Sequence, residues 1–385
     1  MKRLLLGFSL WLSCAAAASA QIGKSVSVAA GTPEDKALSQ IYDTPDGPEK
    51  VALLDKFMAD YGKDELALLG DQLYMQTYLA QKNYAKVVEY GEKALEADPD
   101  NLETIVTMVH AADEQGDAQK MAALAEKAAA IMKRYQASPP PEGTPPEEWS
   151  KTKADNVAKA QNNLDYIQRS AYNAIYKTTD ATAKAGLFER FAAAFPDSPY
   201  RLAALEQAAF AYQQARNVAK MTETANAILS SDPNNVSMLL MLADYWSDAG
   251  KELDRAAADA QKVLDLLAQA KKPDNVAEDQ WQQSVALQKG TAYSSLGQVQ
   301  VIRGRNAPAV DAFQKANPLL KSNTFLYARN LYRLGFTLAK MQRIPEARTT
   351  LTEAVRLDSP YKPLAQETLD KIGGATPRKT ARKSS

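Results

Sequence analysis

Apolar residues recur along this chain at the three- and four-residue spacing of helices that pack one face against a partner. One such stripe holds Val87, Val88, Ala94 and Leu95. No stretch shows the alternation of apolar and polar residues, bounded by turn residues, that is typical of a half-buried strand. The pattern therefore predicts an all-α protein built from amphipathic helices.

Similar segments recur along the chain and indicate an internal repeat. Residues 84–101 read YAKVVEYGEKALEADPDN, residues 304–316 read GRNAPAVDAFQKA, and residues 343–358 read RIPEARTTLTEAVRLD. The pairs Leu296-Gly297 and Leu334-Gly335 precede the last two segments. Small residues at fixed places let two helices approach closely, so we expect helical hairpins that stack on one continuous core.

These segments resemble the tetratricopeptide repeat, a helix–turn–helix unit of about 34 residues. Residues 98–101 (DPDN) and 232–235 (DPNN) resemble the turn between successive repeats of that family. The sequence departs from the family pattern where Lys133 and Lys321 replace a turn proline and where a short insertion follows Gly250. The resemblance implies an all-α fold, a right-handed α–α superhelix. Its repeats are expected at 68–101, 102–135, 202–235, 236–270, 290–323 and 328–361.

A longer period connects two parts of the chain. Ile41-Tyr42 aligns with Ile175-Tyr176, residues 98–99 align with 232–233, and Gly116 aligns with Gly250, without a gap between positions 41 and 116. We interpret this constant offset as the duplication of a block of about two and a half repeats. A consensus shared by all repeats is the alternative explanation of the matching turns.

Proline-rich stretches suggest how the chain is divided. Prolines at 139–141, 145 and 146 prevent a continuous helix, and a weaker break lies at residues 271–275. We predict a signal peptide (1–20), an N-terminal repeat block (21–135), a proline-rich linker (136–147), a second block that duplicates the first (148–270), a C-terminal block with a capping helix (271–372) and a basic disordered tail (373–385).

The N-terminus has the layout of a secretory signal peptide. Lys2-Arg3 precede an apolar run over residues 4–12, and Ala18-Ser19-Ala20 supply small residues before a mature start at Gln21. We therefore expect cleavage after Ala20 and a periplasmic or secreted protein. A retained N-terminal anchor and a lipoprotein modified at Cys14 are the alternatives. No other segment approaches membrane-spanning length, so we expect no transmembrane segment in the mature chain.

Composition narrows the chemistry that this chain can perform. It has 385 residues, one His and one Cys, which excludes an intramolecular disulfide and multi-His or Cys-cluster metal sites. Its 46 basic and 46 acidic residues balance. Six of the basic residues lie in the predicted signal peptide and tail, so the folded body is mildly acidic. This charge argues against nucleic-acid binding by the body.

Motifs of common catalytic and cofactor sites are absent from the sequence. It has no G-x-x-x-x-G-K-[ST] loop, no G-x-G-x-x-G after a strand and no G-x-S-x-G elbow. Acidic pairs such as Asp244 and Asp248 are more typical of a solvated helix face than of acid–base catalysis. We predict no catalytic residue, no cofactor and no metal site.

The resemblance also implies where a partner would bind. In the tetratricopeptide family, the first helix of each repeat lines a concave surface on which peptides or partner helices lie. By repeat register, the candidate binding residues are Gln72, Gln76, His110, Phe210, Asp244, Asp248, Arg329, Tyr332, Arg333 and Phe336. For the aromatic residues among them, packing in the core is an equal alternative. For the histidine, the alternative is an ordinary surface position.

One variant of the family holds a peptide carboxylate with a clamp of Lys, Asn and Arg residues. Arg329 and Arg333 stand at two basic places of that clamp, one helical turn apart. The other clamp residues are missing, and Ser295 stands where one Asn is expected. A complete clamp is therefore not expected, and a solvated helix face is the alternative for the two arginines.

These observations lead to one principal hypothesis and two alternatives. We expect a non-enzymatic interaction scaffold of the cell envelope that binds a protein or peptide on its concave face. The first alternative is an outer-membrane lipoprotein scaffold anchored through Cys14. The second is a helical-repeat enzyme that processes glycans, which would need acidic residues such as Asp244 and Asp248 clustered in one cavity.

Overall fold

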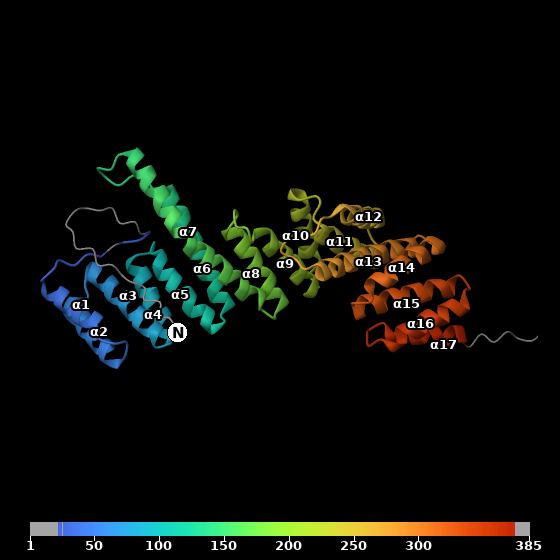
Figure 1. Cartoon of the computed structure of the whole chain (residues 1–385), viewed down its shortest axis with the longest axis horizontal. Helices are drawn as coiled ribbons and strands as arrows, with labels where there is room; N and C mark the ends of the chain where they lie inside the picture. Colours follow the sequence, from blue (N-terminus) through green and yellow to red (C-terminus); the bar gives the residue numbers. More distant parts are fainter. Residues whose placement is uncertain (1–21, 25, 374–385) are drawn as a thin grey trace, which may run out of the picture. The chain divides into compact units, whose positions relative to one another are not determined.

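The computed structural model describes residues 22–24 and 26–373. Within these residues all regular secondary structure is helical, which confirms the all-α prediction (Figure 1). The first nine helices are α1 (Pro33–Asp43), α2 (Pro48–Tyr61), α3 (Asp64–Ala80), α4 (Tyr84–Ala97), α5 (Leu102–Gln115), α6 (Ala118–Ala137), α7 (Pro146–Tyr176), α8 (Ala181–Ala194) and α9 (Arg201–Gln214). The next eight are α10 (Val218–Ser231), α11 (Val236–Ala249), α12 (Leu253–Gln269), α13 (Glu278–Ile302), α14 (Asn306–Leu320), α15 (Thr324–Lys340), α16 (Ile344–Arg356) and α17 (Lys362–Gly373).

The chain divides into two compact units between Ala215 and Arg216. Unit 1 contains α1–α9 and unit 2 contains α10–α17. The division lies between the two helices of the repeat expected over residues 202–235. Each unit is described separately below.

Helical hairpins are the building blocks of both units. In unit 1, α3 packs against α4, α5 against α6, and α8 against α9. In unit 2, α11 packs against α12, α13 against α14, and α15 against α16. Five of these hairpins overlap the repeats expected at 68–101, 102–135, 236–270, 290–323 and 328–361, although α13 begins earlier, at Glu278.

The local structure of the chain recurs at the long period seen in the sequence. The bounds of α4 and α5 correspond, position by position at that offset, to the bounds of α10 and α11. Asn83 and Asn217 cap the N-termini of α4 and α10 with side-chain hydrogen bonds to the third helical residue. Gly116 and Gly250 end α5 and α11 with left-handed φ values of 68° and 67°. Such φ values favour glycine, so the same cap device recurs in both blocks.

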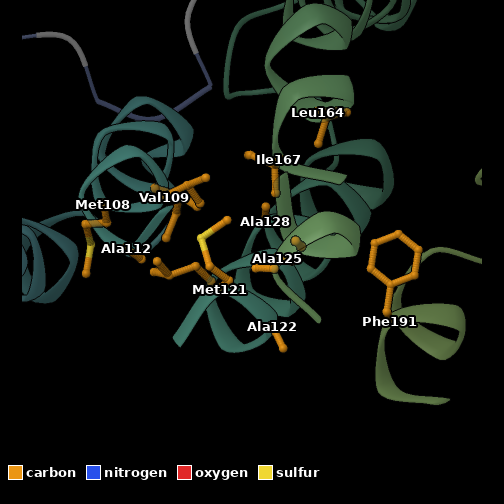
Figure 2. Packing of buried hydrophobic residues seen from close by; sticks show 14 of the residues in the cluster. Met108, Val109, Ala112, Met121, Ala122, Ala125, Ala128, Leu164, Ile167 and Phe191 are labelled. Carbon is orange, nitrogen blue, oxygen red and sulfur yellow. The ribbon is translucent and has the colours of Figure 1, made fainter. Parts of the chain in front are cut away.

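The core of unit 1 joins successive hairpins. Figure 2 shows Met108 and Val109 of α5 beside Met121 of α6, with Ile167 of α7 close by. These side chains are buried, and α5 packs against both α6 and α7. Because α5 contacts both its hairpin partner α6 and the next helix α7, the core continues from one hairpin to the next.

Close helix contacts depend on glycine at two positions in unit 2. A Cβ added to Gly335 of α15 would lie 2.5 Å from Cγ of Leu351 of α16. A Cβ on Gly297 of α13 would lie 2.5 Å from the ring of Phe313 of α14. These are the glycines of the two Leu-Gly pairs, so the expected role of small residues between paired helices is confirmed.

The proline-rich stretch separates α6 from α7, which end and begin at Ala137 and Pro146. The predicted signal peptide with Cys14, and the predicted tail beyond Gly373, lie outside the described residues. In the part of the chain that is described, no helix is both long enough and apolar enough to cross a membrane.

Candidate functional site

Unit 1 contains a cavity of about 760 Å³ lined by α3, α5, α7, Tyr42 of α1 and the N-terminal segment. Gln72 and Gln76 reach it from α3, Thr107 from α5 and Lys159 from α7. Helices α3 and α5 are the first helices of successive hairpins, and Gln72, Gln76 and His110 lie on them. The structure therefore brings two of the predicted binding residues, Gln72 and Gln76, to one cavity.

The cavity combines an apolar base with a polar wall. Leu73, Met75 and Leu102 line it and are almost completely buried. The hydroxyl of Thr104, also in the lining, is buried and has no hydrogen-bond partner among the described residues. Asn163 Nδ2 of α7 donates a 2.8 Å hydrogen bond to Glu103 Oε1 of α5 and so joins the two helices at the wall. Amides and hydroxyls of this kind can bind the backbone of an extended peptide.

One wall of the cavity is the segment that precedes α1. Ile22, Lys24 and Val26 line the cavity. The backbone N–H of Lys24 donates a 2.6 Å hydrogen bond to Asp98 Oδ2, in the turn between α4 and α5. The N–H of Leu102 donates to the Ile22 carbonyl at 3.3 Å. The segment is therefore held through its backbone.

In unit 2, four of the predicted binding residues form an ionic cluster in which both arginines are buried and Asp248 is exposed. Arg329 of α15 donates to both carboxylate oxygens of Asp244 of α11, at 2.7 and 3.0 Å, and to Asp248 Oδ2 at 3.3 Å. Arg333 donates to Asp248 and, at 3.1 Å, to Ser294 Oγ of α13. The structure thus brings Asp244, Asp248, Arg329 and Arg333 together.

Burial shows that the two arginines do not lie on a solvated face. The side chains of Arg329 and Arg333 are 6% and 9% exposed, so the solvated-face alternative for them is wrong. Their clamp-like pair of guanidiniums already holds the carboxylates of this chain's own α11. Ser295, at the place of a clamp Asn, donates to Asp244 Oδ1 at 3.2 Å.

The ionic cluster changes the acidity of its members. Burial by itself would raise the pKa of Asp244. The guanidiniums of Arg329 and Arg333 outweigh burial and hold the pKa of this carboxyl below its ordinary value. Asp244 is therefore a stable carboxylate, and acid–base work by it would first have to break a buried ion pair.

Tyr332 and Phe336 belong to a row of aromatic rings beside this cluster. Their ring centroids are 6.0 Å apart, and Tyr332 lies 6.1 Å from Tyr361. Tyr361 lies 5.6 Å from Phe325, whose side chain is exposed. Tyr332 and Phe336 are half-buried, so they combine packing with a partly open surface.

The remaining predicted residues do not join these groups. His110 is exposed on α5, and it does not line the cavity of unit 1. Phe210 is half-buried on α9. Sequence reasoning missed the contribution of residues 22–24 and of α7 to the cavity. Residues 22–28 carry no helical periodicity, so that pattern gives no signal for the segment.

Comparison with known proteins finds similarity at the level of structure. No protein-family model matches this chain, and no curated protein matches it. The chain is similar to the crystal structure of the APC/C hetero-tetramer Cut9-Hcn1, with a TM-score of 0.43, 12% identity, and coverage of 88% of this chain and 62% of that chain. It thus spans less than two thirds of the length of that chain.

Two further similar structures are described as tetratricopeptide-repeat structures. One is a protein from Parabacteroides merdae, with a TM-score of 0.36, 12% identity, and coverage of 80% of this chain and 98% of that chain. The other is the TPR domain of P58(IPK), with a TM-score of 0.33, 12% identity, and coverage of 89% and 98%. At this identity the likeness concerns the fold alone.

Proposed function

We propose that this protein is a non-enzymatic interaction scaffold that binds an extended peptide, or an extended segment of a partner protein, in the cavity of unit 1. The observation that carries the proposal is the 760 Å³ cavity between α3, α5 and α7. A space of this volume lies in the range of ligand-binding pockets. The resemblance to the tetratricopeptide family supports a partner of this kind.

The polar side chains of the cavity suit a peptide ligand. Gln72, Gln76 and Thr107 offer hydrogen-bond donors and acceptors, and Glu103 and Lys159 add one charge of each sign to the lining. The apolar base formed by Leu73 and Met75 would take an apolar side chain of the peptide.

The ionic cluster of unit 2 argues against the enzymatic alternative. Asp244 and Asp248 are the acidic pair on which that alternative depends. Both accept hydrogen bonds from buried guanidiniums, so neither is placed as a free acid or base. Loss of a measured hydrolytic activity on Asp244→Asn substitution would reverse this conclusion.

A place in the cell envelope is part of the proposal and rests on the sequence of residues 1–21. The intact mass of the mature protein distinguishes the two envelope hypotheses. A chain that begins at Gln21 supports a periplasmic or secreted scaffold. A chain that begins at a lipid-modified Cys14 supports an anchored lipoprotein instead.

Binding in the cavity is tested with a displayed peptide library and the full chain. We expect selected peptides to lose at least about tenfold in affinity when Gln72 and Gln76 are both replaced by Ala, because two hydrogen-bonding side chains are removed. The matched control replaces Gln119 and Gln136 of α6, which are exposed and do not line the cavity. Equal affinity for both double variants would exclude the cavity as the binding site.

A further inference from the structure

Ile22–Lys24 and Val26–Val28 form what we call the N-terminal strap. Its first three residues contact the turn between α4 and α5, at residues 97–102. Two backbone hydrogen bonds hold it there, from Lys24 N–H to Asp98 Oδ2 and from Leu102 N–H to the Ile22 carbonyl. Lys24 Nζ also donates to the Ala97 carbonyl at 3.2 Å. The turn therefore binds a peptide backbone in the present structure.

The middle residue of this contact has to be glycine. Gly23 has a φ of 118°, which side-chain-bearing residues rarely adopt. A Cβ at this place would lie 2.8 Å from Asp98 Oδ2 and 2.9 Å from Asn101 Cα. Both Asp98 and Asn101 are buried, so neither has room to move away.

The residue before the glycine is an apolar anchor. The Ile22 side chain is 4% exposed and belongs to the core cluster that contains Leu102 and Met75. The turn selects the residue after the glycine only weakly, because Lys24 is exposed and contributes mainly its backbone N–H. An extended segment with the order apolar–Gly–X thus fits the turn.

We infer that the turn formed by Ala97, Asp98, Asn101 and Leu102 is a peptide-binding site that selects an apolar–Gly–X segment and that Ile22–Lys24 occupies it as a tethered ligand. Ile22, Lys24 and Leu102 line the cavity of unit 1, so this inference deepens the proposed function and rests on it for the identity of the groove. A partner segment of the same kind would compete with the strap for the turn.

The equivalent turn before α11, at residues 232–236, shows that the strap contact is not a general property of such turns. Leu102 and Val236 are the first residues of α5 and α11, and the N–H of a first helical residue has no partner within its own helix. Leu102 N–H donates to Ile22, whereas Val236 N–H has no partner among the described residues. Protection of the Leu102 amide therefore reports the strap alone, and Val236 is its internal reference.

Residue-resolved hydrogen exchange on the full chain tests whether the strap occupies the turn. Lys24→Pro removes the N–H that donates to Asp98, whereas Lys24→Ala keeps that N–H and removes only the ammonium contact. We expect Leu102 exchange to rise by about threefold to tenfold in the Pro variant and less than about twofold in the Ala variant. Unchanged Leu102 protection in both variants, or protection equal to that of Val236 in the wild type, would overturn the inference.

Binding in trans tests whether the turn selects the segment. A labelled peptide IGKSVSV, which repeats residues 22–28, is titrated against the full-length Lys24→Pro variant and the wild type. We expect the peptide to bind the variant at least about tenfold more tightly, and a peptide with Val in place of the glycine to bind neither. Equal binding of the two peptides contradicts the inference. So does the absence of IGKSVSV binding to the Pro variant when that variant shows raised Leu102 amide exchange.

These experiments distinguish a failure of the strap inference from a failure of the proposed function. If library peptides require Gln72 and Gln76 but IGKSVSV does not bind the Pro variant, the cavity function holds and the strap inference fails. If IGKSVSV binds the turn while no library peptide depends on Gln72 and Gln76, the strap inference holds and the broader function fails.

Discussion

Arg329 and Asp244 lie 85 residues apart in the sequence, yet their side chains form a two-point ion pair with N–O distances of 2.7 and 3.0 Å. The pair crosses from α15 to α11 and passes Ser295 of α13, which donates to the same carboxylate. Three hairpins of unit 2 are thereby tied together through their first helices. The arginine's charge is satisfied inside the fold rather than offered to a ligand.

Breaking this pair is expected to destabilise unit 2 strongly. Arg329→Ala or Asp244→Ala each removes the nearest opposite charge from its partner and leaves only the weaker interaction with Arg333 or Asp248, at a cost of up to about 3–5 kcal/mol. The double variant should lose less than the sum of the two single losses, because neither charge is then left unpaired. Denaturant unfolding of the four proteins measures this coupling.

An exposed ion pair is the control for this experiment. Arg134 and Asp100 interact at 2.5 Å, but both side chains are about half exposed. Arg134→Ala should therefore change the free energy of unfolding by less than about 1 kcal/mol. If Arg329→Ala costs no more than Arg134→Ala, the buried cluster does not stabilise unit 2.

Asp71 of α3 is expected to make unit 1 less stable as the pH rises from about 4 to 6. Burial raises the pKa of Asp71 from 3.8 to about 6, with Lys93 opposing the shift and Glu96 adding to it. The folded chain therefore holds this proton more tightly than the unfolded chain does, and that advantage disappears as the pH passes the folded-state pKa. Asp71→Asn should be increasingly stabilising relative to wild type over this range, measured by unfolding at successive pH values. A difference between the two proteins that does not change with pH would contradict the burial effect.

Asp244 supplies a contrast of opposite sign. Arg329 and Arg333 hold the pKa of Asp244 below its ordinary value. Its contribution to stability is therefore fully present above that ordinary value and is lost as the pH falls through the folded-state pKa. Acid unfolding should accordingly weaken unit 2 at this cluster, and Asp244→Asn should remove that part of the pH dependence.

Glycine at position 335 is expected to be required for the contact between α15 and α16. Gly335→Leu would force a side chain against Leu351 and should cost about 1–3 kcal/mol of unfolding free energy. A Cβ added at Gly186 of α8 would meet no neighbouring atom within 4 Å, so Gly186 is the matched control. Gly186→Ala should stabilise by about 0.5–1 kcal/mol, because alanine favours a helix. Equal effects at the two sites in a thermal melt would argue against the assigned contact.

The asparagine caps of α4 and α10 are expected to contribute equally to the free energy of unfolding. Asn83 and Asn217 each accept a hydrogen bond from the N–H of the lysine three residues later. Replacing either with Ala should cost about 1 kcal/mol, whereas Asp should preserve most of the stability. Denaturant unfolding checks both pairs, and a loss at Asn83 without a similar loss at Asn217 would indicate that the two turns are not energetically equivalent.

The hairpin architecture follows directly from local sequence. Three local patterns predict α3–α6 and α11–α16 well: the Leu-Gly pairs, the DPDN and DPNN turns and the apolar stripes. Each pattern reflects contacts between residues that are close in the sequence. The expected tight contact at Gly335 is found against Leu351, in the partner helix of the same hairpin. Patterns of this kind report the face of a helix that is buried.

Contacts between distant residues could not be predicted in the same way. The repeat register predicts both Arg329 and Asp244 on the concave side, but nothing in the sequence pairs them with each other rather than with a ligand. The strap contact between Ile22 and Leu102 depends on how an extended segment crosses a turn that lies far along the chain, for which helical periodicity carries no information.

The most direct test of a peptide-binding groove in unit 1 is the affinity of library-selected peptides for the full chain and its cavity variants, measured by fluorescence anisotropy. We expect submillimolar binding to the wild type, a loss of at least about tenfold when Gln72 and Gln76 are replaced by Ala, and no loss when Gln119 and Gln136 are replaced. Absence of any selected peptide, or equal affinity for all three proteins, would contradict binding in the cavity.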